Sequence, residues 1–302
     1  MRIINILIFY KMNTIKLSIN KFMNIKFNKI ISKKSKSNLK KCKNKTNTKE
    51  YIQLCKLIQY KYEQYCEESS LLTNKKTPFI IGINGSVSSG KSHAAKIMKN
   101  ILKCLNGNKR VHILSSDNFI YSNKSLRDKK IFDQKGYPRS YDWKLLHKVL
   151  NQITQNKKVE TPFYDQTISD IKYGKKIAIP ANIDILILEG INILKPSCRD
   201  NLDRFLLSDY LDYSIYFYVG EKILRKWFYK RLFAKRKVWK KNKTRKKLTN
   251  KSVSDFRKIS NQIWTKYNKR NLEEFIRPYR YRADVVIYKN KNHNLTNLEF
   301  VL

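Results

Sequence analysis

Glycine, proline and acidic residues are scarce in this sequence. Of its 302 residues only 8 are glycine and 6 are proline, and 23 aspartates and glutamates stand against 65 lysines and arginines, a formal net charge of +42. Such an excess of positive charge attracts nucleic acids and anionic lipids. Lysine, asparagine and isoleucine are all abundant, however, and all three can be encoded by A and T alone. An AT-biased genome is therefore the favoured explanation for most of the charge.

Cysteine and histidine are too few and too scattered to suggest a metal site. The cysteines are Cys42, Cys55, Cys66, Cys104 and Cys198. They form no C-x-x-C pair, and the four histidines have no ligand spacing. This pattern argues against a zinc site or a disulfide framework and predicts reduced thiols, as in the cytoplasm. The apolar stretch from Ile3 to Tyr10 is too short to cross a bilayer, so no membrane association is expected.

Two regions of different composition divide the chain. Residues 1–49 hold 14 lysines and arginines, no acidic residue and no glycine or proline. This composition predicts a basic, low-complexity tail that is disordered. A nucleic-acid-binding arm is the less favoured interpretation. From Glu50 onward apolar residues recur at helical and strand spacing, so residues 50–302 are predicted to form the folded domain.

Apolar strand-like runs alternate with helix-like segments in the second region. The predicted strands are residues 78–84, 111–117, 182–190, 213–219 and 282–288. The predicted helices are residues 50–66, 91–105, 143–153 and 221–236. This alternation indicates an α/β fold, with a doubly wound and mostly parallel sheet flanked by helices.

A glycine-rich loop lies between the first predicted strand and the helix after it. Residues 85–92 read GSVSSGKS and fit the pattern G-x-x-x-x-G-K-[ST] in full. Their members are Gly85, Ser86, Val87, Ser88, Ser89, Gly90, Lys91 and Ser92. In such a P-loop the backbone N–H groups surround the phosphates of ATP, the lysine reaches the β- and γ-phosphates, and the last hydroxyl ligates Mg²⁺. Three of the chain's eight glycines lie between Phe79 and His93, which makes chance a poor explanation.

Acidic residues at strand ends are candidates for the rest of the chemistry. Glu189 ends the strand 182–190 and is predicted to lie near the Mg²⁺, whereas Asp184 would lie at the opposite edge of the sheet. Asp117 closes the strand 111–117, on the same edge as the loop. It is a candidate to take the proton of an acceptor hydroxyl, and a helix or turn cap is an equally open alternative.

Eight segments of the sequence occur in an order found in one enzyme family. They are PFIIGINGSVSSGKS, SSDNFIY, KGYPRSYDW, TPFYDQTISD, DILILEGINIL, SDYLDYSIYF, WFYKR and FIRPYRYRADVV. Together they resemble the bacterial type I pantothenate kinases, relatives of uridine kinase and phosphoribulokinase, from about Glu50 to the end. The resemblance implies a P-loop NTPase fold and a kinase domain over residues 50–302. It also implies a cytoplasmic homodimer that uses ATP and Mg²⁺ to phosphorylate pantothenate, the first step of coenzyme A biosynthesis.

The same resemblance implies roles for individual residues. Asp117 would be the catalytic base, and Arg231 would face the substrate and the charge that develops during transfer. The residues implied at the pantothenate site are Asp117, Tyr164, Gln166, Phe228, Arg231 and Asn268. Asn292 and His293 would lie near the adenine. Coenzyme A, which competes with ATP in this family, would be a feedback inhibitor.

Several positions depart from the family pattern. Gln166 replaces a histidine, Ser169 and Phe228 replace tyrosines, and His93 stands where a threonine is usual. The implied coenzyme A contacts are Lys96, Gln166 and Lys235. Two of them differ in kind from the family's residues, which predicts weaker inhibition.

Two alternatives to a pantothenate kinase stay open. One is a kinase for another small alcohol such as a nucleoside. The other, less favoured, is a nucleic-acid-dependent NTPase that uses the basic tail and the region from Lys222 to Lys251. The sequence contains no motif that reads bases, so nucleic-acid binding is expected to be non-specific at most.

Overall fold

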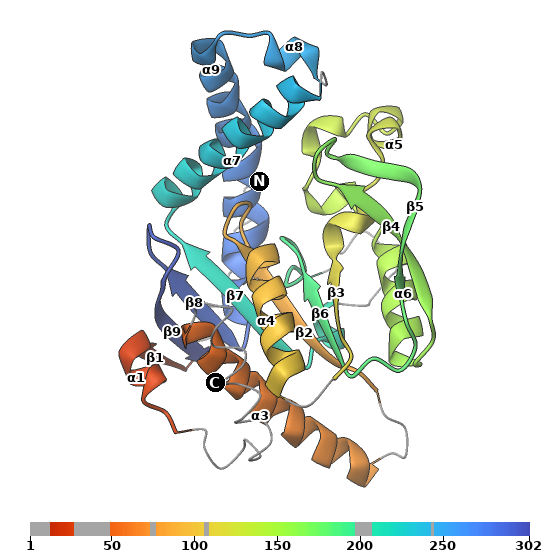
Figure 1. Ribbon diagram of the computed structural model, residues 1–302, viewed down its shortest axis with the longest axis vertical. Helices are drawn as coiled ribbons and strands as arrows, with labels where there is room; N and C mark the ends of the chain where they lie inside the picture. Colours follow the sequence, from red (N-terminus) through yellow and green to blue (C-terminus); the bar gives the residue numbers. More distant parts are fainter. Residues whose placement is uncertain (1–12, 27–48, 73–76, 106–108, 197–206, 243–244) are drawn as a thin grey trace, which may run out of the picture.

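A mixed sheet forms the centre of the protein. The computed structural model describes residues 13–26, 49–72, 77–105, 109–196, 207–242 and 245–302. Among these residues, one seven-stranded sheet has the order β1-β9-β8-β7-β2-β6-β3 (Figure 1). The parallel strands are β2 (Phe79–Gly85), β3 (Val111–Ser115), β6 (Ile185–Glu189), β7 (Tyr213–Val219) and β8 (Val285–Lys289). They match the five predicted strands, so the predicted fold class is confirmed.

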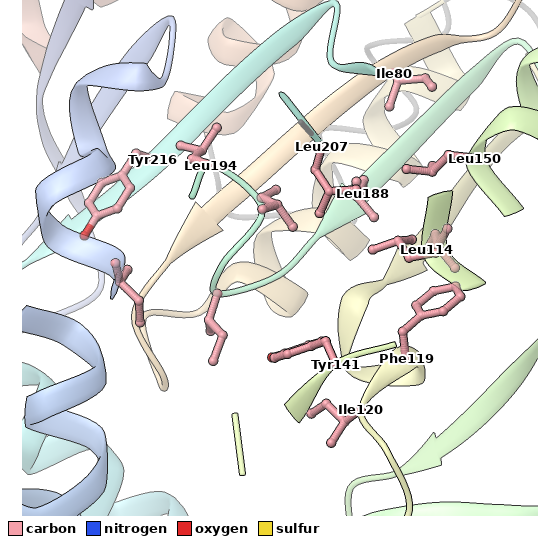
Figure 2. Packing of buried hydrophobic residues seen from close by; sticks show 14 of the residues in the cluster. Ile80, Leu114, Phe119, Ile120, Tyr141, Leu150, Leu188, Leu194, Leu207 and Tyr216 are labelled. Atoms are coloured by element: carbon pink, nitrogen blue, oxygen red, sulfur yellow. The ribbon is translucent and has the colours of Figure 1, made fainter. Parts of the chain in front are cut away.

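Helices cover both faces of this sheet because the strand side chains alternate between two cores. Ile81 and Ile187 face the first core, which the helices α3 (Lys49–Leu72) and α4 (Lys91–Leu105) complete. Ile80 and Leu186 face the second core, which is completed by α6 (Trp143–Thr154) among other segments. Figure 2 shows part of this second core around Leu188 and Tyr216. With apolar residues on both faces, the central strands read as unbroken apolar runs.

Two further parts project beyond the edge of the sheet. One is an antiparallel hairpin of β4 (Val159–Asp165) and β5 (Asp170–Ile179), preceded in the chain by α5 (Asn123–Asp128). The other is an arm of α7 (Glu221–Lys241), α8 (Lys246–Thr249) and α9 (Val253–Ile263) (Figure 1). Beyond α9 the chain continues through π-helical and 3-10 turns to Arg282.

The amino-terminal segment contradicts part of the predicted disordered tail. The strand β1 (Thr14–Ser18) pairs antiparallel with β9 (Leu295–Val301) at the edge of the sheet. The short helix α1 (Ile19–Met23) follows and buries Phe22 completely. Gln53 of α3 donates to the carbonyl oxygen of Phe22 at 3.2 Å, which ties the segment to the core.

The segment is ordered because β9 offers a free row of backbone donors and acceptors and the core offers an apolar site for one aromatic ring. Composition alone did not reveal this pairing. The remainder of the predicted tail, residues 1–12 and 27–48, lies outside the described residues.

Cys55 and Cys66 carry free thiols. Within the described ranges, every helix is either too short or too polar to cross a membrane.

Candidate active site

The loop between β2 and α4 has the backbone geometry of a phosphate cradle. Gly85 and Gly90 have φ angles of 144° and 87°, in the region that side chains disfavour. A Cβ on Gly85 would lie 2.8 Å from the carbonyl oxygen of Phe217, so this position accepts only glycine. The Ser89 N–H donates to the Ser86 carbonyl at 3.2 Å and closes the turn. Gly85 is therefore required by close approach as well as by its dihedral angle, and Gly90 by its dihedral angle.

Three serine hydroxyls of this loop are buried without a hydrogen-bond partner in the described part of the chain. They belong to Ser86, Ser88 and Ser89. Ser88 also has a φ of 64°, unusual for a residue with a side chain. Unpaired buried hydroxyls and local backbone strain are costly, and both are found where a loop is shaped for a ligand. The loop therefore fits a polyphosphate.

Lys91 reaches back over the loop from the first turn of α4. Its side chain is only 7% exposed, and its Nζ donates to the Ser86 carbonyl at 2.8 Å. Burial lowers the pKa of Lys91 to about 8, against the opposing effect of Glu189 and Asp117. Its charge is thus held in a dry site, where it interacts strongly with an anion.

Glu189 lies at the carboxyl end of β6, beside the start of α4. Its Oε1 accepts hydrogen bonds from Ser92 at 3.1 Å and from Ser115 at 2.7 Å. Burial, and next the charge of Asp117, raises the pKa of this carboxyl group. Asp184, by contrast, lies at the other end of the strand and accepts from the Arg110 backbone at 2.8 Å. The structure thus brings Ser92 and Glu189 together and keeps Asp184 away from the loop.

Three elements meet through the side-chain amide of Gln166. Asp117 lies in a 3-10 turn after β3, Gln166 in the turn between β4 and β5, and Arg231 on α7. Gln166 Nε2 donates to Asp117 Oδ2 at 2.8 Å, and Arg231 Nη2 donates to Gln166 Oε1 at 2.9 Å. One neutral side chain therefore links the candidate base to the candidate arginine.

These residues line a cavity of about 470 Å³ next to the loop. Every residue implied at the pantothenate site lines it: Asp117, Tyr164, Gln166, Phe228, Arg231 and Asn268. Lys91, Ser92 and Glu189 line it as well, so the phosphate loop opens into the same space. Burial, and next the charge of Asp117, raises the pKa of Tyr164, so its hydroxyl stays protonated. A cavity of this size suits a small polar molecule.

A second hollow of about 420 Å³ borders the loop on the side of α7. It is lined by Gly90, His93, Lys230 and the stacked rings of Trp227 and His293 among others. The two ring centroids lie 3.7 Å apart at an angle of 14°.

Burial and three neighbouring basic residues lower the pKa of His293, which favours the neutral ring. Because it lines this second hollow, His293 lies beside the loop. Asn292 is exposed and lines neither of these two hollows, and its N–H donates to Asn290 Oδ1 at 2.9 Å.

Sequence reasoning missed how the turn of residues 166–169 is held. Its four successive carbonyl oxygens each accept a hydrogen bond from a different side chain. The donors are Lys235 to residue 166 at 2.7 Å, Trp239 to residue 167 at 2.7 Å, Arg245 to residue 168 at 2.6 Å, and Lys135 to residue 169. We call this turn with its donors the carbonyl clamp. In a chain so rich in lysine and arginine, nothing in the sequence distinguishes Lys135 and Arg245 from surface charges.

Comparison with known proteins shows which family this chain resembles. A model of the phosphoribulokinase/uridine kinase family matches residues 80–296. A pantothenate kinase of Latilactobacillus sakei is 36% identical over 253 residues, which cover 80% of each chain. Another, of Ligilactobacillus salivarius, is 33% identical over 74% of this chain and 72% of its own length.

Among solved structures, D-glycerate 3-kinase of Cryptococcus neoformans superposes with a TM-score of 0.54 at 15% identity. The alignment covers 80% of this chain and 97% of that one, and it supports the fold alone.

Proposed function

Since the chain belongs to the phosphoribulokinase/uridine kinase family of P-loop kinases, which use ATP, we propose that it transfers the γ-phosphoryl group of ATP to the primary hydroxyl of pantothenate. The product would be 4′-phosphopantothenate, the first intermediate of coenzyme A biosynthesis. The observation that carries the proposal is the likeness to proteins named pantothenate kinase over most of both chains. The cavity beside the P-loop supports it, because all the residues implied for the acceptor line that cavity.

The loop and its lysine would bind the donor. The N–H groups of residues 86–91 and the ammonium of Lys91 would surround the phosphates. Ser92 and Glu189 offer two oxygen atoms 3.1 Å apart, the kind of donor that Mg²⁺ prefers. The described residues contain no cluster of three or more His, Cys, Asp or Glu side chains, as fits a Mg²⁺ held largely by phosphate oxygens and water. The ion would neutralise charge on the transferred phosphoryl group.

Asp117 and Arg231 would act on the acceptor. As the acceptor oxygen forms its bond to the γ-phosphorus, the bond from that phosphorus to ADP breaks, and Asp117 accepts the proton of the hydroxyl. Arg231 would stabilise the negative charge that spreads over the phosphoryl oxygens. Gln166 would hold these two groups in a fixed relative position, since it forms a hydrogen bond with each of them. Tyr164 and Asn268 would orient the rest of the acceptor.

Three further properties belong to this proposal. The enzyme would be a cytoplasmic homodimer, as the family resemblance implies. Coenzyme A would inhibit it by competing with ATP, and weakly. The ammonium of Lys235 is already engaged with the Gln166 carbonyl at 2.7 Å, at a position where the family has an aromatic ring.

A coupled ADP-release assay tests the proposal. Pantothenate, uridine and poly(A) are compared at equal concentration with the full chain, ATP and Mg²⁺. Release of ADP with pantothenate, together with a phosphorylated product identified by mass, is expected. Turnover with uridine alone would identify a nucleoside kinase, and stimulation by poly(A) alone would identify a nucleic-acid-dependent NTPase; either result would overturn the proposal.

A further inference from the structure

A second lysine, far from the P-loop in the sequence, contacts the loop from a neighbouring strand end. Lys289 is the last residue of β8, and its Nζ donates to the Ser89 carbonyl at 3.1 Å, 200 positions away in the sequence. Its side chain is only 7% exposed and lies with the ammonium 4.6 Å from the ring centroid of Phe217. No function assigned so far explains why a lysine is buried here.

Lys289 and Lys91 hold opposite ends of the same turn. Lys91 donates to the Ser86 carbonyl and Lys289 to the Ser89 carbonyl, and Ser86 and Ser89 are themselves joined by a backbone hydrogen bond. A Cβ on Gly90 would lie 3.0 Å from Lys289 Nζ, closer than nearly all such contacts. The second glycine of the motif therefore also makes room for the Lys289 ammonium.

The charge of Lys289 lacks a counter-ion in the described part of the chain. In these residues the Lys289 Nζ contacts one carbonyl oxygen and the face of one aromatic ring, and no carboxylate lies within ion-pair distance. Burial, and next the charge of Lys91, lowers the pKa of Lys289 to about 8. Burying an ammonium group without a carboxylate partner costs free energy, and an anion bound on the adjacent loop would offset that cost.

We propose that Lys289 is a positioning residue for the phosphates of the nucleotide. Its hydrogen bond fixes the Ser89 end of the loop, and its charge adds to that of Lys91 beneath the bound polyphosphate. Lys289 lines neither hollow described above, so it acts through the loop and through its field rather than by direct contact. The inference rests on the proposed function only for the nucleotide and does not involve the acceptor.

The test compares Lys289→Met, which keeps the stem, with Lys289→Arg, which keeps the charge. Lys291→Met is the matched control, because Lys291 is exposed in the following turn. Isothermal titration gives the Kd of ADP, and displacement of ADP gives that of adenosine. Lys289→Met is expected to weaken ADP by about tenfold or more, the usual effect of losing one charged hydrogen-bonding group, while adenosine binding stays unchanged. Lys289→Arg should recover most of the ADP affinity, and Lys291→Met should behave as the parent chain.

Unchanged ADP affinity in Lys289→Met would overturn the inference. Equal weakening of ADP and adenosine would also overturn it, because that result means a merely structural role. If the Met variant does not fold, Lys289→Gln takes its place, with the same outcomes. Since no arm uses pantothenate, failure of the acceptor assay leaves this test intact.

Discussion

The amide of Gln166 donates to one catalytic candidate and accepts from the other, so its orientation depends on both. A carboxylate at this position could not donate to Asp117, and an ammonium could not accept from Arg231. An amide also keeps its charge state at every pH, unlike the histidine that the family usually has at this position. Gln166 itself therefore adds no titrating group to the link between base and arginine in this chain.

Replacing Asp117 by asparagine should separate catalysis from binding. Asp117→Asn keeps the size of the side chain but removes the proton acceptor, so kcat is expected to fall by about 10²- to 10⁴-fold. The affinity for ATP should change little, because the P-loop is untouched. Steady-state kinetics and ADP titration measure the two quantities. Weaker nucleotide binding with an unchanged kcat would mean that Asp117 serves the donor and not the acceptor.

Replacing Lys91 by alanine should leave a folded and inactive protein. The change removes the charge that faces the phosphates, so kcat is expected to fall by about 10²- to 10³-fold. Its desolvation cost disappears with it, so the thermal midpoint should not fall. Lys103→Ala, at an exposed position of the same helix, is the control. Near-normal turnover in a folded Lys91→Ala protein would refute the P-loop assignment.

The elements that sequence reasoning found are those whose surroundings leave a clear pattern. Strands β2 and β6 are buried along their whole length and read as apolar runs. Strand β5 is largely exposed and contains several lysines, so it lacks the apolar run that marks a buried strand. Strand β1 was missed because its pairing partner, β9, lies at the far end of the chain.

The residues of the candidate site also divide into those that carry a readable sequence pattern and those that do not. The P-loop, Asp117 and Glu189 carry a motif or a strand-end position, and both are readable from the sequence. Lys289, Lys135 and Arg245 were not found, because a buried basic residue and a surface one look alike in a chain with 65 basic residues. Only three-dimensional contacts separate them.

Phe22 should anchor the amino-terminal element to the sheet. Its ring is fully buried, so Phe22→Ala is expected to lower the free energy of unfolding by about 3–5 kcal/mol, the usual cost of such a cavity. Ile15→Ala, in the same segment but 48% exposed, should change it by about 0.5 kcal/mol or less. Urea denaturation of both variants measures the difference. If Phe22→Ala were as stable as the parent chain, the segment would not contribute to the fold.

For the whole molecule, the crowding of basic groups around one site makes stability depend on pH. Burial lowers the pKa of Lys135, Lys235 and Lys289 to about 8 each. In the unfolded chain these lysines titrate near about 10.4, so between the two values the unfolded chain holds more protons than the folded one. The free energy of unfolding of the nucleotide-free protein therefore rises as the pH increases from about 8 toward 10.

Urea denaturation at about pH 7.5 and 9.5 checks this expectation. Above about pH 10 the trend should reverse, because burial raises the pKa of tyrosines such as Tyr164 and Tyr216 and the unfolded chain then ionises first. Saturating ADP should reduce the part of the rise that Lys289 contributes, since the bound phosphates would keep this lysine charged. A fall in stability between the two pH values would contradict the assigned pKa shifts.

The carbonyl clamp has a consequence for how this enzyme can change over generations. The acceptors of the turn are backbone oxygens, which every amino acid supplies, so substitutions at Thr167 or Ile168 leave the hydrogen bonds from Trp239 and Arg245 available. The hairpin and the arm can stay joined while the side chains at the tip of the turn drift. Mutational tolerance is thus concentrated on Thr167 and Ile168, and constraint on the residues that donate to their carbonyl oxygens. In descendants that keep this clamp, the side chains at positions 167 and 168, beside the acceptor cavity, can change while the hairpin stays joined to the arm.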